Sequence, residues 1–275
     1  MIEDALGPVD YDESGRGPAI LFVPGSCSTG AAWKPVIAAL GASYRSITTS
    51  LPGYGGSAER RTEADPSIGV IAAAVETVIR HAGGAVHLVG HSFGGDVALA
   101  VALRGQVRVR SLTILEAPAP AMLSAFERWA EYDQFRAMTS AYVQEYRSGN
   151  AEAIAAMVDF YGGAGTFASW PSAVRRYAVK TTPTNILDWQ SAYACEHSAA
   201  ALAELNLPVL VAVGENSHSA VVEANSLIAK AIPGARFATI KGATHFMIAT
   251  HARAVADLIA QHIGLSDQPP PRLSR

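Results

Sequence analysis

A serine stands between two glycines in the stretch GHSFG, Gly90 to Gly94. The segment AVHLV, Ala85 to Val89, before it is typical of a strand, and the residues from Phe93 onward have a helical pattern. In a G-x-S-x-G sequence between a strand and a helix, the serine lies on a sharp turn that exposes its hydroxyl. We therefore predict that Ser92 is a nucleophile. The alternative is a chance pentapeptide in a chain with 24 glycines.

A carboxylate ends a second apolar run, SLTILE, from Ser111 to Glu116. This run reads as the strand that follows the helix after Ser92, and side chains at its carboxyl end open onto the same crevice. An ionised carboxylate closing an apolar strand is costly unless it has a partner, which favours a catalytic histidine beside it. We expect Glu116 to be the acid of a catalytic triad, the alternative being a solvated residue near the entrance to the site.

Strand-like and helix-like segments alternate over most of the chain, which predicts an α/β fold with a mostly parallel sheet flanked by helices. The expected strands are Ala19–Val23, Tyr44–Thr48, Ala85–Val89, Leu112–Leu115, Pro208–Val213 and Arg236–Ile240. The expected helices are Ala31–Leu40, Ser67–His81, Phe93–Leu103, Ala220–Ala231 and Ala252–Ile263. Residues 119–205 lack a convincing strand and are expected to form an inserted helical cap on a core of residues 1–118 and 206–265. Residues 266–275 are expected to be a flexible tail.

Three further stretches complete a resemblance to the α/β-hydrolase superfamily. They are Pro24-Gly25-Ser26 after the first predicted strand, LPGYGGS at 51–57 and KGATHF at 241–246. With GHSFG they cover most of the chain outside the insertion. The resemblance implies an α/β-hydrolase fold, an inserted cap and a serine nucleophile that needs no cofactor or metal. It does not specify a substrate.

The resemblance also implies roles for other residues. The loop after the last strand carries the base in this fold, so His245 is the expected base; a surface loop histidine is the alternative. Backbone N–H groups of Phe93 and Ser26 would form the oxyanion hole. The family more often has His-Gly where this chain has Pro24-Gly25, which leaves open what holds the loop in place. His91, next to Ser92, is expected to be a packing residue.

The loop Gly214 to Ser219 lacks the acid that the resemblance leads one to expect. Many members have G-x-x-D after this strand, and alignment on Gly214 puts the uncharged Ser217 in that slot. Some branches, including haloalkane dehalogenases, take their acid from the end of the strand that holds Glu116 here. Glu215 is therefore the alternative acid, while Asp96 and Asp188 are less favoured.

The predicted activity is hydrolysis of an ester-type bond, in a carboxylester or a lactone, through an acyl-enzyme on Ser92. The alternatives are a C–C bond hydrolase, a perhydrolase, or a small-ligand receptor with weak catalysis. The predicted partner is a small, largely apolar substrate. Candidate pocket residues are Cys27, Trp129, Phe160, Trp170, His218 and Phe246. Phe126, Tyr161, Phe167 and Trp189 could also line a pocket, or form the core of the cap.

Composition sets wider limits. The chain has 275 residues, 49% of them hydrophobic and 16% charged, which suits one large domain with an insertion. A net charge of -3 without runs of like charge argues against nucleic acid or an anionic membrane as partner. We expect no signal peptide and no membrane span. The two cysteines, Cys27 and Cys195, suggest neither a disulfide nor a metal site, so a cytoplasmic location is expected. The sequence does not indicate an oligomeric state.

Overall fold

The computed structural model describes residues 1–4, 7–195 and 198–267. Its centre is a seven-stranded sheet in the order β3-β5-β4-β6-β7-β8-β9. The strands are β3 (Asp12–Ser14), β4 (Ala19–Val23), β5 (Arg45–Thr48), β6 (Ala85–His91), β7 (Arg108–Leu115), β8 (Val209–Gly214) and β9 (Arg236–Ile240). All neighbouring strands are parallel except β3, which runs antiparallel to β5. A separate hairpin pairs β1 (Ile2–Asp4) with β2 (Gly7–Val9).

Helices cover both faces of this sheet, which explains why strands such as β4 and β8 are continuously apolar. One face is covered by α2 (Ile68–His81), α3 (Phe93–Arg104) and α11 (Ser219–Ala231). The other is covered by η1 (Gly30–Trp33), α1 (Lys34–Leu40), α12 (Met247–Thr250) and α13 (Ala252–Ser266). Every residue of β8 is buried. The predicted α/β-hydrolase fold is confirmed, and the segment Ala31–Leu40 is divided between η1 and α1.

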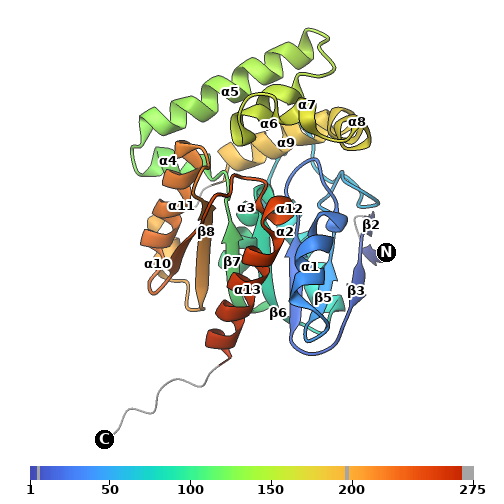
Figure 1. The fold of residues 1–275 in the computed structure, drawn as a ribbon, viewed down its shortest axis with the longest axis vertical. Helices are drawn as coiled ribbons and strands as arrows, with labels where there is room; N and C mark the ends of the chain where they lie inside the picture. Colours follow the sequence, from blue (N-terminus) through green and yellow to red (C-terminus); the bar gives the residue numbers. More distant parts are fainter. Residues whose placement is uncertain (5–6, 196–197, 268–275) are drawn as a thin grey trace, which may run out of the picture.

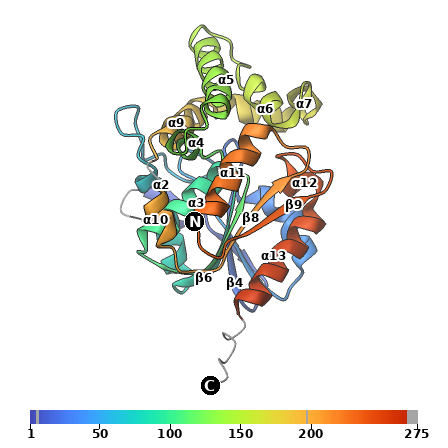
Figure 2. The same ribbon diagram turned by 90° about the vertical axis from the view of Figure 1, so that its left-hand side faces the viewer.

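A helical cap lies over the carboxyl edge of the sheet (Figures 1 and 2). It is inserted between β7 and β8. Its helices are α4 (Pro120–Ala125), α5 (Trp129–Arg147), α6 (Ile154–Gly162), α7 (Thr166–Ser169), α8 (Ser172–Lys180) and α9 (Thr182–Tyr193). The last helix of the insertion, α10 (Ala199–Ala203), lies instead beside α11 on the flank of the sheet (Figure 2). The part of the insertion that lies over the sheet edge therefore ends with α9. The boundary expected from the sequence was later, at residue 205.

The expected tail begins within a helix, because Ser266 is the last residue of α13. Residues 268–275 lie outside the described part of the chain. No helix in the described ranges is long and apolar enough to cross a membrane.

Candidate active site

Ser92 occupies a strained turn between β6 and α3. Its backbone has φ 53° and ψ -133°, a region that costs a non-glycine residue about 1–3 kcal/mol. The two flanking glycines make the turn feasible. A Cβ on Gly90 would lie 2.2 Å from the Gly94 carbonyl oxygen, and one on Gly94 would lie 2.3 Å from the Pro24 carbonyl oxygen. The Ser92 N–H donates to the Leu115 carbonyl at 2.9 Å, which fixes the turn to β7.

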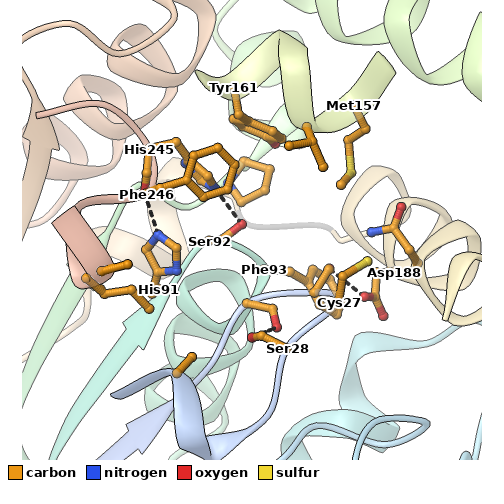
Figure 3. A pocket seen from close by; sticks show the side chains of 18 of the residues that line it. Cys27, Ser28, His91, Ser92, Phe93, Met157, Tyr161, Asp188, His245 and Phe246 are labelled. Atoms are coloured by element: carbon orange, nitrogen blue, oxygen red, sulfur yellow. Dashed lines mark hydrogen bonds between the residues drawn. The ribbon is translucent and has the colours of Figure 1, made fainter. Parts of the chain in front are cut away.

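His245 links the serine to a carboxylate. Its Nε2 lies 2.9 Å from Ser92 Oγ (Figure 3), and its Nδ1 lies 2.7 Å from Glu116 Oε2. A carboxylate can only accept, so the imidazole proton belongs on Nδ1. Nε2 is then free to accept the serine proton. All three side chains are shielded from bulk solvent, with Glu116 fully buried. The spacing and tautomer are those that general-base activation of a serine requires.

Three donors converge on Glu116. The Gly214 N–H donates to Oε1 at 2.6 Å, Ser217 Oγ donates to the same oxygen, and His245 donates to Oε2. Burial alone would raise the pKa of Glu116. The hydrogen bond and charge of His245, together with the hydrogen bonds from Ser217 and Gly214, outweigh burial and hold that pKa below its ordinary value. Ser217, in the slot of the expected aspartate, therefore donates to a carboxylate that comes from another strand.

Glu215 has a different position. It is exposed, and its Oε2 accepts a hydrogen bond from the Gly242 N–H at 2.8 Å. It braces the loop that carries His245 without hydrogen-bonding the imidazole. Glu116, and not Glu215, therefore hydrogen-bonds the His245 imidazole.

His91 also braces this loop. Its Nε2 donates to the backbone carbonyl of His245 at 2.8 Å (Figure 3). Burial, together with the neighbouring His245, lowers the pKa of His91 to about 3, so its ring stays neutral at physiological pH. A packing role was expected for this residue, and the structure adds a hydrogen bond that positions His245.

The loop from Pro24 to Cys27 packs against Ser92. A Cβ on Gly25 would lie 2.8 Å from Ser92 Cβ. Ser26 and Phe93 both line the cavity next to Ser92. Phe93 is the first residue of α3, where a backbone N–H has no acceptor within the helix.

Burial raises the pKa of the Cys27 thiol to about 12, which keeps the thiol protonated and unsuited to nucleophilic attack.

A buried charge cluster, not anticipated from the sequence, anchors this loop to the cap. Asp188 on α9 accepts hydrogen bonds from Ser26 Oγ at 2.5 Å and from Tyr54 Oη at 2.6 Å. Its other oxygen is 2.8 Å from Arg61 Nη1, in an ion pair without hydrogen-bond geometry. The Arg61 side chain is fully buried and also pairs with Glu59. These contacts hold the loop in the absence of a histidine at position 24.

A cavity of about 490 Å³ opens beside Ser92. Of the expected pocket residues, Cys27, Trp170 and Phe246 line it. The expectation was wrong for Trp129, Phe160 and His218. The Trp129 side chain is 54% exposed at the start of α5. Phe160 stacks on His218 with ring centroids 3.9 Å apart, and neither residue is part of the cavity lining.

The cavity lining comes from both the core and the cap. The cap residues include Met157, Val158, Tyr161, Trp170, Val174, Asn185, Asp188, Trp189 and Ala192. The core contributes the residues around Ser92 and His245. The ring of Tyr161 stacks on His245, with centroids 4.0 Å apart and planes at 22° (Figure 3). The cap therefore covers one face of the His245 imidazole. Within the described part of the chain, no group of three or more His, Cys, Asp or Glu could hold a metal ion.

Solved structures share this architecture. A thermophilic esterase from Thermogutta terrifontis is similar, with a TM-score of 0.75, 22% sequence identity and 94% of each chain covered. The enol-lactonase from Burkholderia xenovorans LB400 has a TM-score of 0.75 and 19% identity, covering 93% of this chain and 96% of that one. At these identities the likeness concerns the fold.

Among curated proteins, the pimeloyl-[acyl-carrier protein] methyl ester esterase of Aeromonas hydrophila is 32% identical over 111 residues, which are 40% of this chain and 42% of that protein. The matching segments span between 7% and 42% of the lengths of the curated relatives. The family model described as alpha/beta hydrolase fold matches residues 18–252. That match covers most of the 275 residues, and the chain therefore belongs to the alpha/beta hydrolase family.

Proposed function

We propose that this protein is a serine hydrolase that cleaves the carboxylic ester or lactone bond of a small, largely apolar substrate. The observation that carries the proposal is the continuous hydrogen-bonded chain from Ser92 to His245 to Glu116, with contacts of 2.9 Å and 2.7 Å, at the wall of a cavity. A nucleophile, a base and a group that orients the base are the minimum that acyl transfer through a serine requires.

In the first half-reaction, Ser92 Oγ attacks the substrate carbonyl carbon while His245 Nε2 takes the hydroxyl proton. The carbonyl oxygen becomes an oxyanion, which the backbone N–H groups of Ser26 and Phe93 stabilise. Glu116 stays ionised, because its pKa is held low, and stabilises the imidazolium. The imidazolium then protonates the leaving alkoxide, and the alcohol departs from the acyl-enzyme.

In the second half-reaction, water replaces the alcohol. His245 removes a proton from the water as it attacks the acyl carbon, and the collapse of the second tetrahedral intermediate returns the proton to Ser92. The products are a carboxylic acid and the regenerated enzyme. A lactone follows the same route, except that both halves of the product remain in one molecule.

The cavity supports a substrate of modest size. Its volume of about 490 Å³ is within the ordinary range for small-molecule sites, and side chains such as Met157, Trp170 and Phe246 supply apolar walls. The names of similar proteins, an esterase, an enol-lactonase and a methyl ester esterase, are consistent with ester-type bonds.

The test is a pair of measurements on wild type and Ser92→Ala. Wild type should hydrolyse short p-nitrophenyl esters and should form a covalent adduct on Ser92 with a fluorophosphonate. Ser92→Ala should do neither. Undiminished ester turnover by Ser92→Ala would refute the nucleophile. The absence of both turnover and adduct in wild type would instead favour a small-ligand receptor.

A further inference from the structure

Two polar side chains interrupt the apolar cap wall of the cavity. Asn185 and Asp188 both line the cavity from α9. They are three residues apart, so they lie on the same face of the helix. Only 1% of Asn185 and 2% of Asp188 is exposed to solvent. The cavity therefore has a polar corner, which we define as Asn185 and Asp188.

The two side chains differ in how their hydrogen-bonding capacity is used. The Asp188 carboxylate accepts hydrogen bonds from Ser26 and Tyr54 and forms an ion pair with Arg61. The Asn185 amide has no hydrogen bond to any residue in the described part of the chain, and its Oδ1 is buried and unpaired. A buried amide that lacks a partner is costly, and nearly all such groups in folded proteins are paired. A partner supplied by the substrate would remove that cost.

The charges around the corner limit what this partner can be. The Asp188 carboxylate is already paired with Arg61 and accepts hydrogen bonds from Ser26 and Tyr54. The corner therefore offers neither a free cation to an anionic group nor a free anion to a cationic one. Arg61 is itself fully buried and held by Glu59, so it is not available to a substrate. An uncharged amide offers both a donor and an acceptor, and its natural complement is an uncharged hydroxyl or secondary amide.

We propose that the substrate is an ester or lactone carrying an uncharged hydroxyl or secondary amide, and that Asn185 hydrogen-bonds this group and so determines specificity. This inference rests on the serine hydrolase activity proposed above and adds a substrate class to it. A site built to pair a polar group also discriminates against analogues that lack it, because the Asn185 amide would remain unpaired when they bind.

Tyr161 provides a control for the Asn185 variants, because it is a second buried polar side chain at the same cavity. Its hydroxyl is also buried without a partner, and it lines the same cavity. Its ring, however, stacks on His245, whereas Asp188 lies on the other side of Ser92 (Figure 3). Tyr161→Phe removes this second unpaired group and leaves the polar corner intact. A substrate hydroxyl held by Asn185 should not be affected by that change.

The experiment uses pairs of esters that differ only in a hydroxyl or its methyl ether. Methyl 3-hydroxyhexanoate and methyl 6-hydroxyhexanoate place the group in the acyl part, and 4-hydroxybutyl hexanoate places it in the alcohol part. The measured quantity is the ratio of kcat/KM for each hydroxy ester to that of its ether. Wild type should prefer the hydroxy member of at least one pair by about tenfold. In Asn185→Leu this ratio should fall to about one, and in Tyr161→Phe it should persist.

Asn185→Ala is the second variant in case leucine disturbs the cap, and fluorophosphonate labelling of Ser92 checks that each variant retains a formed site. No preference in any pair, or a preference that survives both Asn185 variants, would overturn the inference while leaving the hydrolase intact. A preference lost only in Tyr161→Phe would show that Tyr161, and not Asn185, makes the polar contact, and would also overturn the inference. If wild type hydrolyses none of the esters and Ser92 takes no label, the proposed function fails, and the inference fails with it.

Discussion

Replacing Glu116 by glutamine should abolish most of the activity through the tautomer of the base. The two carboxylate oxygens face different partners. Oε1 accepts from the Gly214 N–H at 2.6 Å and from Ser217, while Oε2 accepts from His245 Nδ1 at 2.7 Å. Glutamine has one carbonyl oxygen and one NH₂ group. The Gly214 and Ser217 donors favour the carbonyl oxygen at the Oε1 position, which places the NH₂ group at the Oε2 position, facing His245.

An NH₂ group facing Nδ1 favours the imidazole tautomer with its proton on Nε2. That tautomer cannot accept the proton of Ser92, and the charge that stabilises the imidazolium is also lost. A comparable change in serine hydrolase triads lowers kcat by about 10⁴-fold, or about 5 kcal/mol in the activation free energy. The fold should persist, because the Gly214 and Ser217 hydrogen bonds remain.

The assay is kcat for a p-nitrophenyl ester, with circular dichroism as the check on folding. Glu215→Gln is the matched control. Glu215 accepts a hydrogen bond only at an exposed loop edge, from the Gly242 N–H, so this control should lose less than about threefold in kcat. Ser217→Ala, which removes one of three donors to Glu116, should lose less than about tenfold. A larger loss in Glu215→Gln than in Glu116→Gln would refute the reasoning.

Three further predictions concern buried polar groups and the turn at the nucleophile. Asp188→Asn should lower the free energy of unfolding by about 3 kcal/mol in urea titrations, because the buried Arg61 guanidinium keeps only the more exposed Glu59 as a charge partner; an unchanged midpoint would contradict this. Burial raises the pKa of Asp96 to about 8 in the folded protein, from 3.8 in the unfolded chain. The free energy of unfolding therefore has its full contribution from neutral Asp96 below pH 3.8 and loses it as the pH rises towards 8. Asp96→Asn should therefore be increasingly more stable than wild type across that interval, by about 1.4 kcal/mol per pH unit at most, and parallel pH profiles of the two proteins would count against it. Gly94→Ala should reduce ester turnover by orders of magnitude, because its Cβ would lie 2.3 Å from the Pro24 carbonyl oxygen; full activity would show that the loop can move without cost.

The sequence predicts the parts of the site that depend on local patterns at strand ends. Ser92 and Glu116 follow buried strands, and His245 follows β9. Parallel strands bring their carboxyl ends to one edge, so Ser92 and Glu116 lie close together, and the loop that leaves β9 at the same edge brings His245 to them. The positions of Glu116 and Ser217 relative to each other follow from the pairing of β7 with β8.

Contacts that depend on how the cap docks are not readable from the chain. The hydrogen bond between Ser26 and Asp188 joins residues 162 positions apart, and no periodicity marks either partner. The cap aromatics show the same limit. Tyr161 and Phe160 are neighbours in α6, but only Tyr161 faces the cavity, because successive helical residues point about 100° apart.

The antiparallel strand β3 was also missed from the sequence. It is short and entirely exposed, so it has no apolar pattern.

The central claim is that Ser92 carries the acyl group during turnover. Its most direct test is rapid-quench mass spectrometry of the intact protein mixed with an excess of p-nitrophenyl butyrate, followed by peptide mapping. The account predicts a transient mass increase of one butyryl group, located on Ser92, that accumulates to a greater extent when deacylation is slowed and disappears as substrate is exhausted. Steady ester hydrolysis with no butyryl group on Ser92, or with the group on another residue such as Cys27, would contradict it.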